Sequence, residues 1–271
     1  MKAKIILLAI ISVIIVSCQS SQKATQLSNN EHNSKLIAVA WYQNSPEMMA
    51  LYYQGFNLAQ ERLDDAIASN KQSKPLAVVA DIDETLLNNS PFEVNSIKNT
   101  NDQTSWHEWS SKAGAKALPG ALEFAKYIQS KGAELFYITN RDDNERAATL
   151  KNLISEGFPF ADDAHLLTKS DLSYSTGSTS SKVGRRAKVS ENHEIVLLLG
   201  DNLNDFSEAF EDRSQNYGKE AVEKFRDEFG EKFIVLPNPI YGAWEKPLYD
   251  YKSGLTEEEK TTLLKSKLRT E

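Results

Sequence analysis

The sequence predicts an α/β fold in which helices cover both faces of a Rossmann-like parallel sheet, with a smaller helical cap. Four short runs rich in apolar residues have the composition of strands buried on both faces, which is typical of parallel sheets. Stretches with apolar residues at helical spacing separate these runs, and this alternation predicts a doubly wound sheet. A length of 271 residues is enough for one large domain with an elaborated cap.

The predicted elements alternate along the chain. Ser45 and Pro46 have the residue types of a helix cap and first turn, and a capping box at Thr256 and Glu259 predicts a C-terminal helix. The acidic stretch after the first strand is expected to begin a further helix. The expected strands lie within residues 76–80, 133–140, 194–199 and 233–236, and the other expected helices lie within residues 47–69, 119–132 and 143–155.

The N-terminal residues are predicted to serve targeting rather than folding. A short basic region precedes an apolar run over residues 5–16, which is shorter than the ~20 residues of a membrane-spanning helix. This arrangement predicts a signal peptide over residues 1–17. Residues 18–34 are polar and lack periodicity, so we expect a flexible tether there.

Residues 35–271 are expected to form one domain. The cap is expected to be helical and to be assembled from three separate segments. These segments span about residues 35–70, 88–117 and 206–230.

Cys18 is the only cysteine, and it follows a small residue at the end of the apolar run. This pattern resembles a bacterial lipoprotein box, and the resemblance implies cleavage before Cys18 and attachment of lipid to it. The alternative is an ordinary signal peptide with an incidental cysteine. Gln19 is not the aspartate that usually retains lipoproteins at the inner membrane, so we expect an envelope protein anchored in the outer membrane. The net charge of −7 gives no indication of binding to a nucleic-acid polymer.

Polar side chains follow three of the predicted strands directly. Alone, an acidic pair after a strand is often a turn or a helix cap, and a lysine is usually a solvated surface residue. In an open α/β sheet, however, ligands bind beyond the carboxyl ends of the strands, so these side chains are expected to converge. They are Asp81 and Asp83 after the first strand, Thr139 and Asn140 after the second, and Asp201 and Asp205 after the third, with Lys182 before the third strand.

Four motifs in this order resemble the haloacid dehalogenase superfamily of phosphohydrolases, and more closely the class C acid phosphatases, the bacterial lipoprotein e family of nucleotidases. They read DIDETLLNNSPF, ITNR, LLLGDNLNDF and VLPNPIYGAWE. The resemblance extends over about residues 35–250. It implies a haloacid dehalogenase-like core and an Mg²⁺-dependent acid phosphatase. The implied substrates are small phosphomonoesters, above all nucleoside 5′-monophosphates, and the implied intermediate is an aspartyl phosphate.

The resemblance also implies roles for the acidic residues. Asp81 would be the nucleophile, and Asp83 would protonate the leaving alcohol and then activate water. Mg²⁺ would bind the Asp81 side chain, the Asp83 backbone carbonyl and Asp201, and Asp205 would hold a metal-bound water or support Lys182. Residues i and i+2 of a strand point the same way, so the first two carboxylates can flank one phosphate.

The remaining implied roles concern the phosphoryl group. The Thr139 hydroxyl and the Asn140 backbone N–H would bind phosphoryl oxygens, and Lys182 would neutralise the phosphate. Lys182 fits a K-x-x-R setting with Arg185, which we place among the substrate-binding residues. Lys169 is a rival for the lysine role, but it lies too early in the sequence.

Aromatic residues are candidates for stacking on a base or an aromatic leaving group, although each of them can equally belong to the core of the cap. Tyr241 is the foremost candidate by the resemblance. Phe92 is followed by Glu93, where many relatives have a further aromatic residue, so one wall of the pocket departs from the family pattern. The candidates are Phe92, Trp106, Trp109 and Tyr241.

Two other functions compete with hydrolysis. One is a non-catalytic binding or uptake lipoprotein, for haem as an example, and the intact set of acids and lysine argues against it. The other is a phosphotransferase that passes the phosphoryl group to an alcohol, which the sequence does not distinguish from hydrolysis. The expected partners are a small phosphomonoester and a membrane, and the oligomeric state stays open, a homodimer included.

Overall fold

The computed structural model describes residues 35–69, 74–97, 105–170 and 180–270. The predicted signal peptide, Cys18 and the tether over residues 18–34 lie outside the described residues. Among the helices of these ranges, none is both long and apolar enough to cross a membrane.

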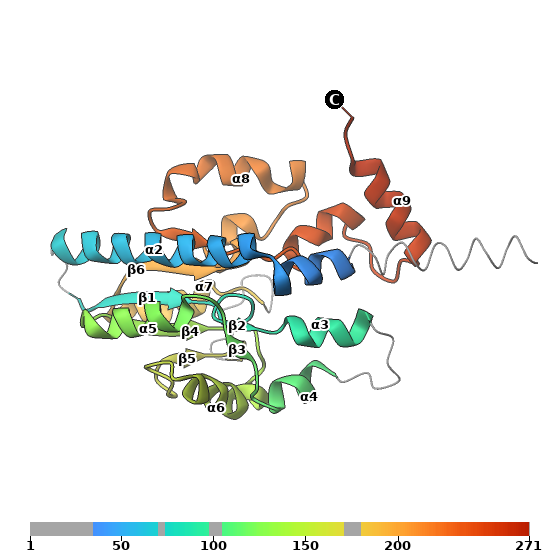
Figure 1. Cartoon of the computed structure of the whole chain (residues 1–271). Coiled ribbons are helices and arrows are strands. Elements are labelled where there is room, and N and C mark those ends of the chain that lie inside the picture. The colour runs from blue at the N-terminus through green and yellow to red at the C-terminus, as the bar shows by residue number, and fades with distance from the viewer. Residues whose placement is uncertain (1–34, 70–73, 98–104, 171–179, 271) are drawn as a thin grey trace, which may run out of the picture.

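A central sheet of five parallel strands organises the chain, in the order β5-β4-β1-β6-β7 (Figure 1). The strands are β1 (Leu76–Ala80), β4 (Glu134–Ile138), β5 (Leu166–Leu167), β6 (Glu194–Gly200) and β7 (Phe233–Val235). The predicted α/β class and four of these strands are confirmed. The fifth, β5, contains two residues, which is too short a run to show any periodicity.

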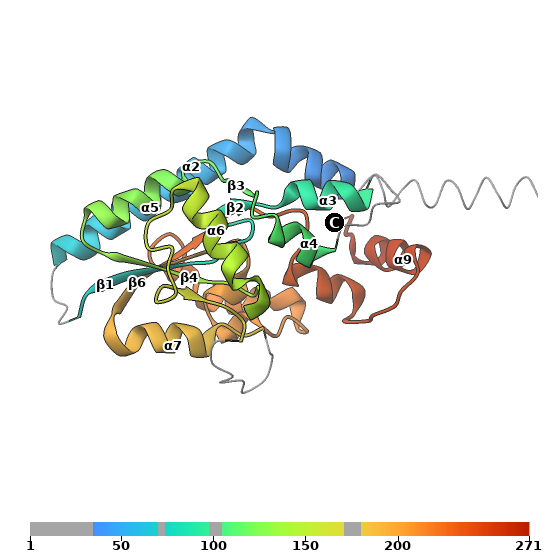
Figure 2. The same ribbon diagram turned by 90° about the horizontal axis from the view of Figure 1, so that it is seen from below.

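Helices cover both faces of the sheet (Figure 2). One face carries α2 (Pro46–Ser69), α5 (Ala121–Ser130) and α6 (Arg146–Glu156). The other face carries α7 (Val183–Asn192) and α8 (Lys219–Lys224). This arrangement places the carboxyl ends of β1, β4 and β6 at one edge of the layered core.

Helix α2 belongs to the core and not to a cap, which corrects the expectation for residues 35–70. Its buried side chains recur every three or four positions and join the main hydrophobic cluster with strands β1 and β4. Burying an apolar side chain of this kind contributes about 1.5–3 kcal/mol. The buried residues of this stripe are Met48, Tyr52, Phe56, Ala59 and Leu63.

Residues 206–230 also pack against the sheet, on the face opposite α2. Their phenylalanines form a second hydrophobic cluster around Phe233 of β7, with ring centroids 5.1–6.3 Å from that residue. The segment holds α8 and the 3₁₀ turns η3 (Glu208–Phe210), η4 (Asn216–Gly218) and η5 (Arg226–Glu228). This part of the predicted cap is therefore a core layer as well.

Residues 88–117 form the insertion that the sequence predicts. A two-stranded antiparallel pair, β2 (Leu87–Asn88) with β3 (Lys116–Ala117), closes its base. Helices α3 (Ser90–Ile97) and α4 (Trp106–Ser111) lie within it. Directly before β2, the chain makes a turn in which the Glu84 backbone N–H donates to the Leu87 carbonyl oxygen at 2.9 Å, so the helix expected at this point is replaced by a loop.

Short elements complete the chain on the carboxyl side. They are η1 (Asp143–Glu145), η2 (Leu203–Asp205), η6 (Ala243–Tyr249) and α9 (Glu257–Lys267). The capping box predicted at Thr256 and Glu259 begins α9, as expected.

Candidate active site

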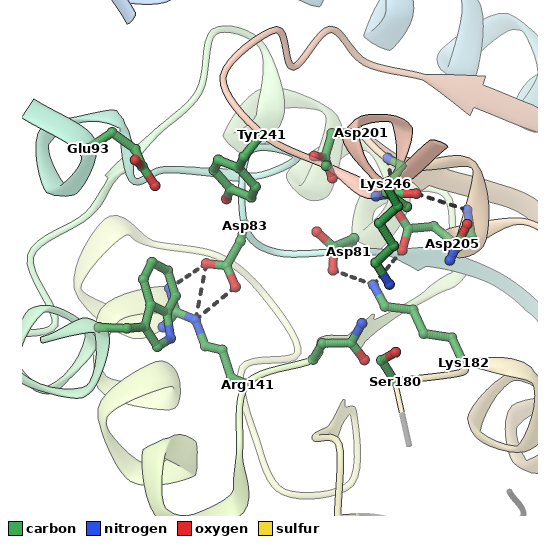
Figure 3. Close-up of a pocket in the computed structure, with 16 residues that line it drawn as sticks. Asp81, Asp83, Glu93, Arg141, Ser180, Lys182, Asp201, Asp205, Tyr241 and Lys246 are labelled. Carbon is green, nitrogen blue, oxygen red and sulfur yellow. Dashed lines mark hydrogen bonds and ion pairs between the residues drawn. The ribbon is translucent and has the colours of Figure 1, made fainter. Parts of the chain in front are cut away.

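A cavity of about 410 Å³ opens where β1, β4 and β6 end (Figure 3). Most of the predicted site residues line it. These are Asp81, Asp83, Trp106, Asn140, Lys182, Asp201, Asp205 and Tyr241. Segments that are far apart in the sequence thus meet at the carboxyl edge of the sheet, where α/β folds bind ligands.

Lys182 connects two of the carboxylates. Its Nζ contacts Asp81 Oδ1 and lies 2.7 Å from Asp205 Oδ1, and its side chain is buried. Burial raises the pKa of Asp81 to about 7 and Lys182 opposes that rise. Burial alone would lower the pKa of Lys182, but Asp205 and Asp81 outweigh it and raise that pKa, so the lysine stays charged.

Asp201 completes a cluster of carboxylates with Asp81 and Asp205, in which one oxygen from each residue lies within 4.8 Å of the others. Burial and then the charge of Asp81 raise the pKa of Asp201 well above its usual value. Asn238 Nδ2 donates to Asp201 Oδ2 at 2.8 Å and so orients it. Within the cavity only Lys182 offsets these charges by direct contact among the described residues, and hard oxygen donors with excess negative charge suit a divalent cation.

The loop that carries Asp205 is held from behind by two arginines. Arg213 Nη2 donates to Asn202 Oδ1 and to Asn204 Oδ1, both at 2.9 Å. Arg186 Nη1 donates to the Asp205 carbonyl oxygen at 2.8 Å. The sequence analysis missed both arginines, and the only available signal was the position of Arg186 directly after Arg185.

Asp83 turns away from the carboxylate cluster. Arg141 Nη2 donates to Asp83 Oδ1 at 2.7 Å, and Asn89 Nδ2 donates to the same oxygen at 2.7 Å. The sequence analysis gave Arg141 no role, although its place directly after Asn140 at the end of β4 was a signal. The geometry leaves the Asp83 side chain outside the potential metal cluster, in agreement with the expectation that only its backbone carbonyl binds metal.

Thr139 and Arg185 lie beneath the cavity and do not line it. The Thr139 hydroxyl is fully buried and accepts the backbone N–H of Arg141 at 3.1 Å, so its predicted contact with phosphate stays a prediction. Arg185 donates to the Thr139 carbonyl oxygen and, at 2.7 Å, to Asn140 Oδ1. Because it is only 1% exposed, it supports the loop after β4 and does not reach the cavity, which corrects its assignment as a substrate-binding residue.

The aromatic candidates divide into two groups. Tyr241 and Trp106 line the cavity, and the Tyr241 hydroxyl donates to Glu84 Oε2. Phe92 does not line it and packs edge-on against Trp106 with 5.2 Å between ring centroids. Trp109 Nε1 donates to Asn89 Oδ1 at 2.9 Å and thereby takes a structural role.

The rival lysine and the histidines lie elsewhere. Lys169 Nζ is 3.8 Å from Asp142 Oδ1 and does not line the cavity, whereas Lys182 does. His165 and His193 both contact Glu134 Oε2, at 3.1 and 3.2 Å. Since Glu134 is the first residue of β4, this contact lies at the opposite end of that strand from the cavity.

Comparison with known proteins identifies the family. A model of the HAD superfamily, subfamily IIIB (Acid phosphatase), matches residues 5–244, and the chain belongs to this family. The structure of the class C acid phosphatase from Bacillus anthracis is similar, with a TM-score of 0.79 and 41% identity over 88% of this chain and 98% of that chain. A second structure of that enzyme, with tungstate bound, gives the same values.

Plant proteins are more distant relatives. Acid phosphatase 1 of Solanum lycopersicum is 28% identical over 197 residues, which cover 69% of each chain. A stem 31 kDa glycoprotein of Glycine max is 27% identical over 169 residues, which cover 59% of this chain and 57% of the relative.

The chain is therefore an acid phosphatase, a phosphomonoesterase of the haloacid dehalogenase superfamily. Phosphatases of this superfamily usually use a divalent metal, and an acidic cluster with suitable donors is present here. The enzyme class sets aside the non-catalytic binding lipoprotein as the main function.

We predict that Glu84→Gln reduces the dependence of folding stability on pH. Burial and then the charge of Asp83 raise the pKa of Glu84 to about 8, against ~4.3 in an unfolded chain. Between these values the folded protein retains a proton that the unfolded chain has released, so the free energy of unfolding falls as pH rises. Glutamine cannot titrate but can still accept the Asn89 backbone N–H, which lies 2.7 Å from Glu84 Oε1.

The measurement is urea unfolding of the wild type and the variant at several pH values from 5 to 8, with a chelator present. Glu123→Gln, on the exposed surface of α5, is the matched control and should leave the slope unchanged. Equal slopes for the wild type and Glu84→Gln would contradict the prediction.

Proposed function

We propose that this acid phosphatase requires Mg²⁺ and hydrolyses small phosphomonoesters, foremost nucleoside 5′-monophosphates, through an aspartyl phosphate on Asp81. The observation that carries the proposal is the buried Asp81, which Lys182 contacts and which shares a carboxylate cluster with Asp201 and Asp205. Phosphoryl transfer depends mainly on positioning and on charge stabilisation, and this arrangement offers both.

The metal would be held by the side chains of Asp81 and Asp201 and by the backbone carbonyl of Asp83. When bound, Mg²⁺ acts as a Lewis acid that offsets the charge of the phosphoryl oxygens. The 2.7 Å contact of Asp205 with Lys182 favours the second of its two expected roles, support of the lysine.

The residues of the chain would carry the reaction in two steps. Asp81 attacks phosphorus as the bond to the leaving oxygen breaks, and Asp83 gives that oxygen a proton. Water then attacks the phosphorus of the aspartyl phosphate, the bond to Asp81 breaks, and Asp83 takes the proton from water. Lys182 stays protonated throughout and stabilises negative charge beside Asp81.

Two features support an oxyanion and a nucleoside as the parts of the substrate. The related Bacillus anthracis enzyme has been solved with tungstate, an oxyanion similar to phosphate in shape and charge. Tyr241 and Trp106 line a cavity of about 410 Å³ here, and a base stacked on an aromatic ring gains about 1–3 kcal/mol. Phosphotransfer to an alcohol uses the same first step and would be revealed by product analysis with added nucleoside.

The proposal is tested by the release of phosphate from a nucleoside 5′-monophosphate and from ribose 5-phosphate, with Mg²⁺ or with a chelator. We expect release that requires metal, a higher kcat/KM for the nucleotide, and a loss of ~10³-fold or more for Asp81→Asn without loss of folding. Asp65→Asn on the exposed surface of α2 is the matched control and should stay fully active. Near-normal turnover by Asp81→Asn would exclude the aspartyl phosphate, and equal kcat/KM values would exclude the nucleotide preference.

We also predict that Gly200→Ala weakens the use of Mg²⁺. A Cβ atom at Gly200 would lie 2.3 Å from Asp205 Oδ2 and 2.6 Å from Asp205 Cβ, so the Asp205 side chain must move away from Lys182. Changes to groups that support metal ligands typically cost about 10- to 100-fold in affinity. The measurement is the Mg²⁺ concentration that gives half-maximal phosphate release.

Gly114→Ala is the control, because a Cβ atom at this glycine would meet nothing within 4 Å. If both variants needed the same Mg²⁺ concentration as the wild type, Asp205 would have no part in the metal site.

We propose, in addition, that Cys18 carries a lipid that anchors the enzyme in the bacterial outer membrane. The proposal depends on the sequence around Cys18, which lies outside the described residues. We expect a radiolabelled fatty acid to be incorporated into the wild type and not into Cys18→Ser, with the labelled protein in the outer-membrane fraction. Equal labelling of the two proteins would refute the anchor.

A further inference from the structure

The two oxygens of the Asp83 carboxylate have unequal surroundings. Oδ1 accepts hydrogen bonds from Arg141 Nη2 at 2.7 Å, Asn89 Nδ2 at 2.7 Å and Arg141 Nε at 3.1 Å. Oδ2 accepts Arg141 Nε at 3.2 Å, as the weaker branch of a shared bond, and has no other donor among the described residues. The lone pairs of Oδ1 are therefore occupied, and Oδ2 is the oxygen left for the cavity that Asp83 lines.

Arg141 is held rigidly while it makes these contacts. Its side chain is 1% exposed, and Nη1 donates to Thr149 Oγ1 at 3.1 Å. Its guanidinium carbon lies 5.6 Å from the centre of the Trp106 ring, which is close enough for a cation–π interaction. The planar fork of an arginine binds both oxygens of a carboxylate at once, which a lysine cannot do.

Asn89 is also oriented by its neighbours. Its Oδ1 accepts the Trp109 indole N–H at 2.9 Å, so its amide nitrogen must be the atom that faces Asp83. Trp109 and Trp106 both belong to α4 of the insertion. The insertion thus reaches Asp83 through two separate contacts, one through Asn89 and one through Arg141.

We infer that Arg141 and Asn89 are positioning residues that occupy Oδ1 of Asp83 and so make Oδ2 the atom that transfers the proton. This inference rests on the proposed acid and base role of Asp83. In the first step the electron pair of the breaking P–O bond goes to the leaving oxygen, which takes the proton from Asp83 Oδ2 while the bond between phosphorus and Asp81 forms. In the second step Oδ2 takes a proton from the attacking water. Trp109 fixes the arrangement by setting the orientation of the Asn89 amide.

The test compares two substrates whose leaving groups differ in their need for a proton. The p-nitrophenolate ion is a weak base and leaves unprotonated, whereas the alkoxide of a nucleoside 5′-monophosphate needs the acid. The readout is kcat/KM, which covers the steps up to departure of the leaving group, for the full-length protein in mild detergent with saturating Mg²⁺. General acid catalysis contributes about 10²–10⁴-fold to such steps.

We expect Arg141→Lys to lower kcat/KM for the nucleotide about tenfold more than for p-nitrophenyl phosphate, a fraction of the full effect of the acid. Arg141→Gln, which also removes the charge, should widen this difference, so that lysine gives partial rescue. Trp109→Phe removes only the indole N–H, and it should produce a smaller difference in the same direction. Because this variant keeps an aromatic ring, it tests the inference even if the arginine variants do not fold.

Arg146→Lys is the matched control, because Arg146 also pairs with an aspartate, Asp143, at 2.8 Å but does not line the cavity. It should affect both substrates equally. Asp83→Asn is the benchmark: if it shows no difference between the substrates, the proposed role of Asp83 fails. If Asp83→Asn shows the difference while the variants of Arg141 and Trp109 lower both substrates equally, Arg141 and Asn89 are merely structural and the inference is overturned.

Discussion

The burial of several carboxylates beyond the ends of β1 and β6 is the constraint on which the rest of the structure depends. Charges of one sign in a low-dielectric site repel each other, and each loses its hydration. Asp81, Asp201 and Asp205 come together here with Lys182 as their contacting cation. The site is therefore stable only with further positive charge, and a substrate anion can approach the nucleophile only under the same condition.

The surrounding elements supply fixed positions instead of additional charge. Strand β6 ends in a glycine that leaves room for Asp205, and the loop after it is held by buried arginines that donate to amide and carbonyl oxygens. Arg185 likewise donates to the loop after β4. The cations nearest to the site thus divide into those that contact carboxylates, Lys182 and Arg141, and those that hold backbone in place.

Much of the fold and of the site was predictable because the relevant signals are local. Strands, caps and the acidic pairs after strands depend on neighbouring residues, so Asp81, Asp201 and Lys182 were recognised. Arg141 was missed because its partner Asp83 lies 58 positions away and no local pattern reports that contact. Helix α2 was assigned to a cap because periodicity reveals an apolar face but not the surface that covers it.

The pairing of β2 with β3 brings both ends of residues 88–117 together at the base of the insertion. Because this closure is made by the backbone, the length of chain beyond it is under little geometric restraint from the sheet, and doubling a flexible loop costs only about 0.6 kcal/mol. Evolution can therefore lengthen or replace this excursion while the chemistry at the sheet is conserved. The range of accepted esters and the reaction itself can diverge independently within one fold.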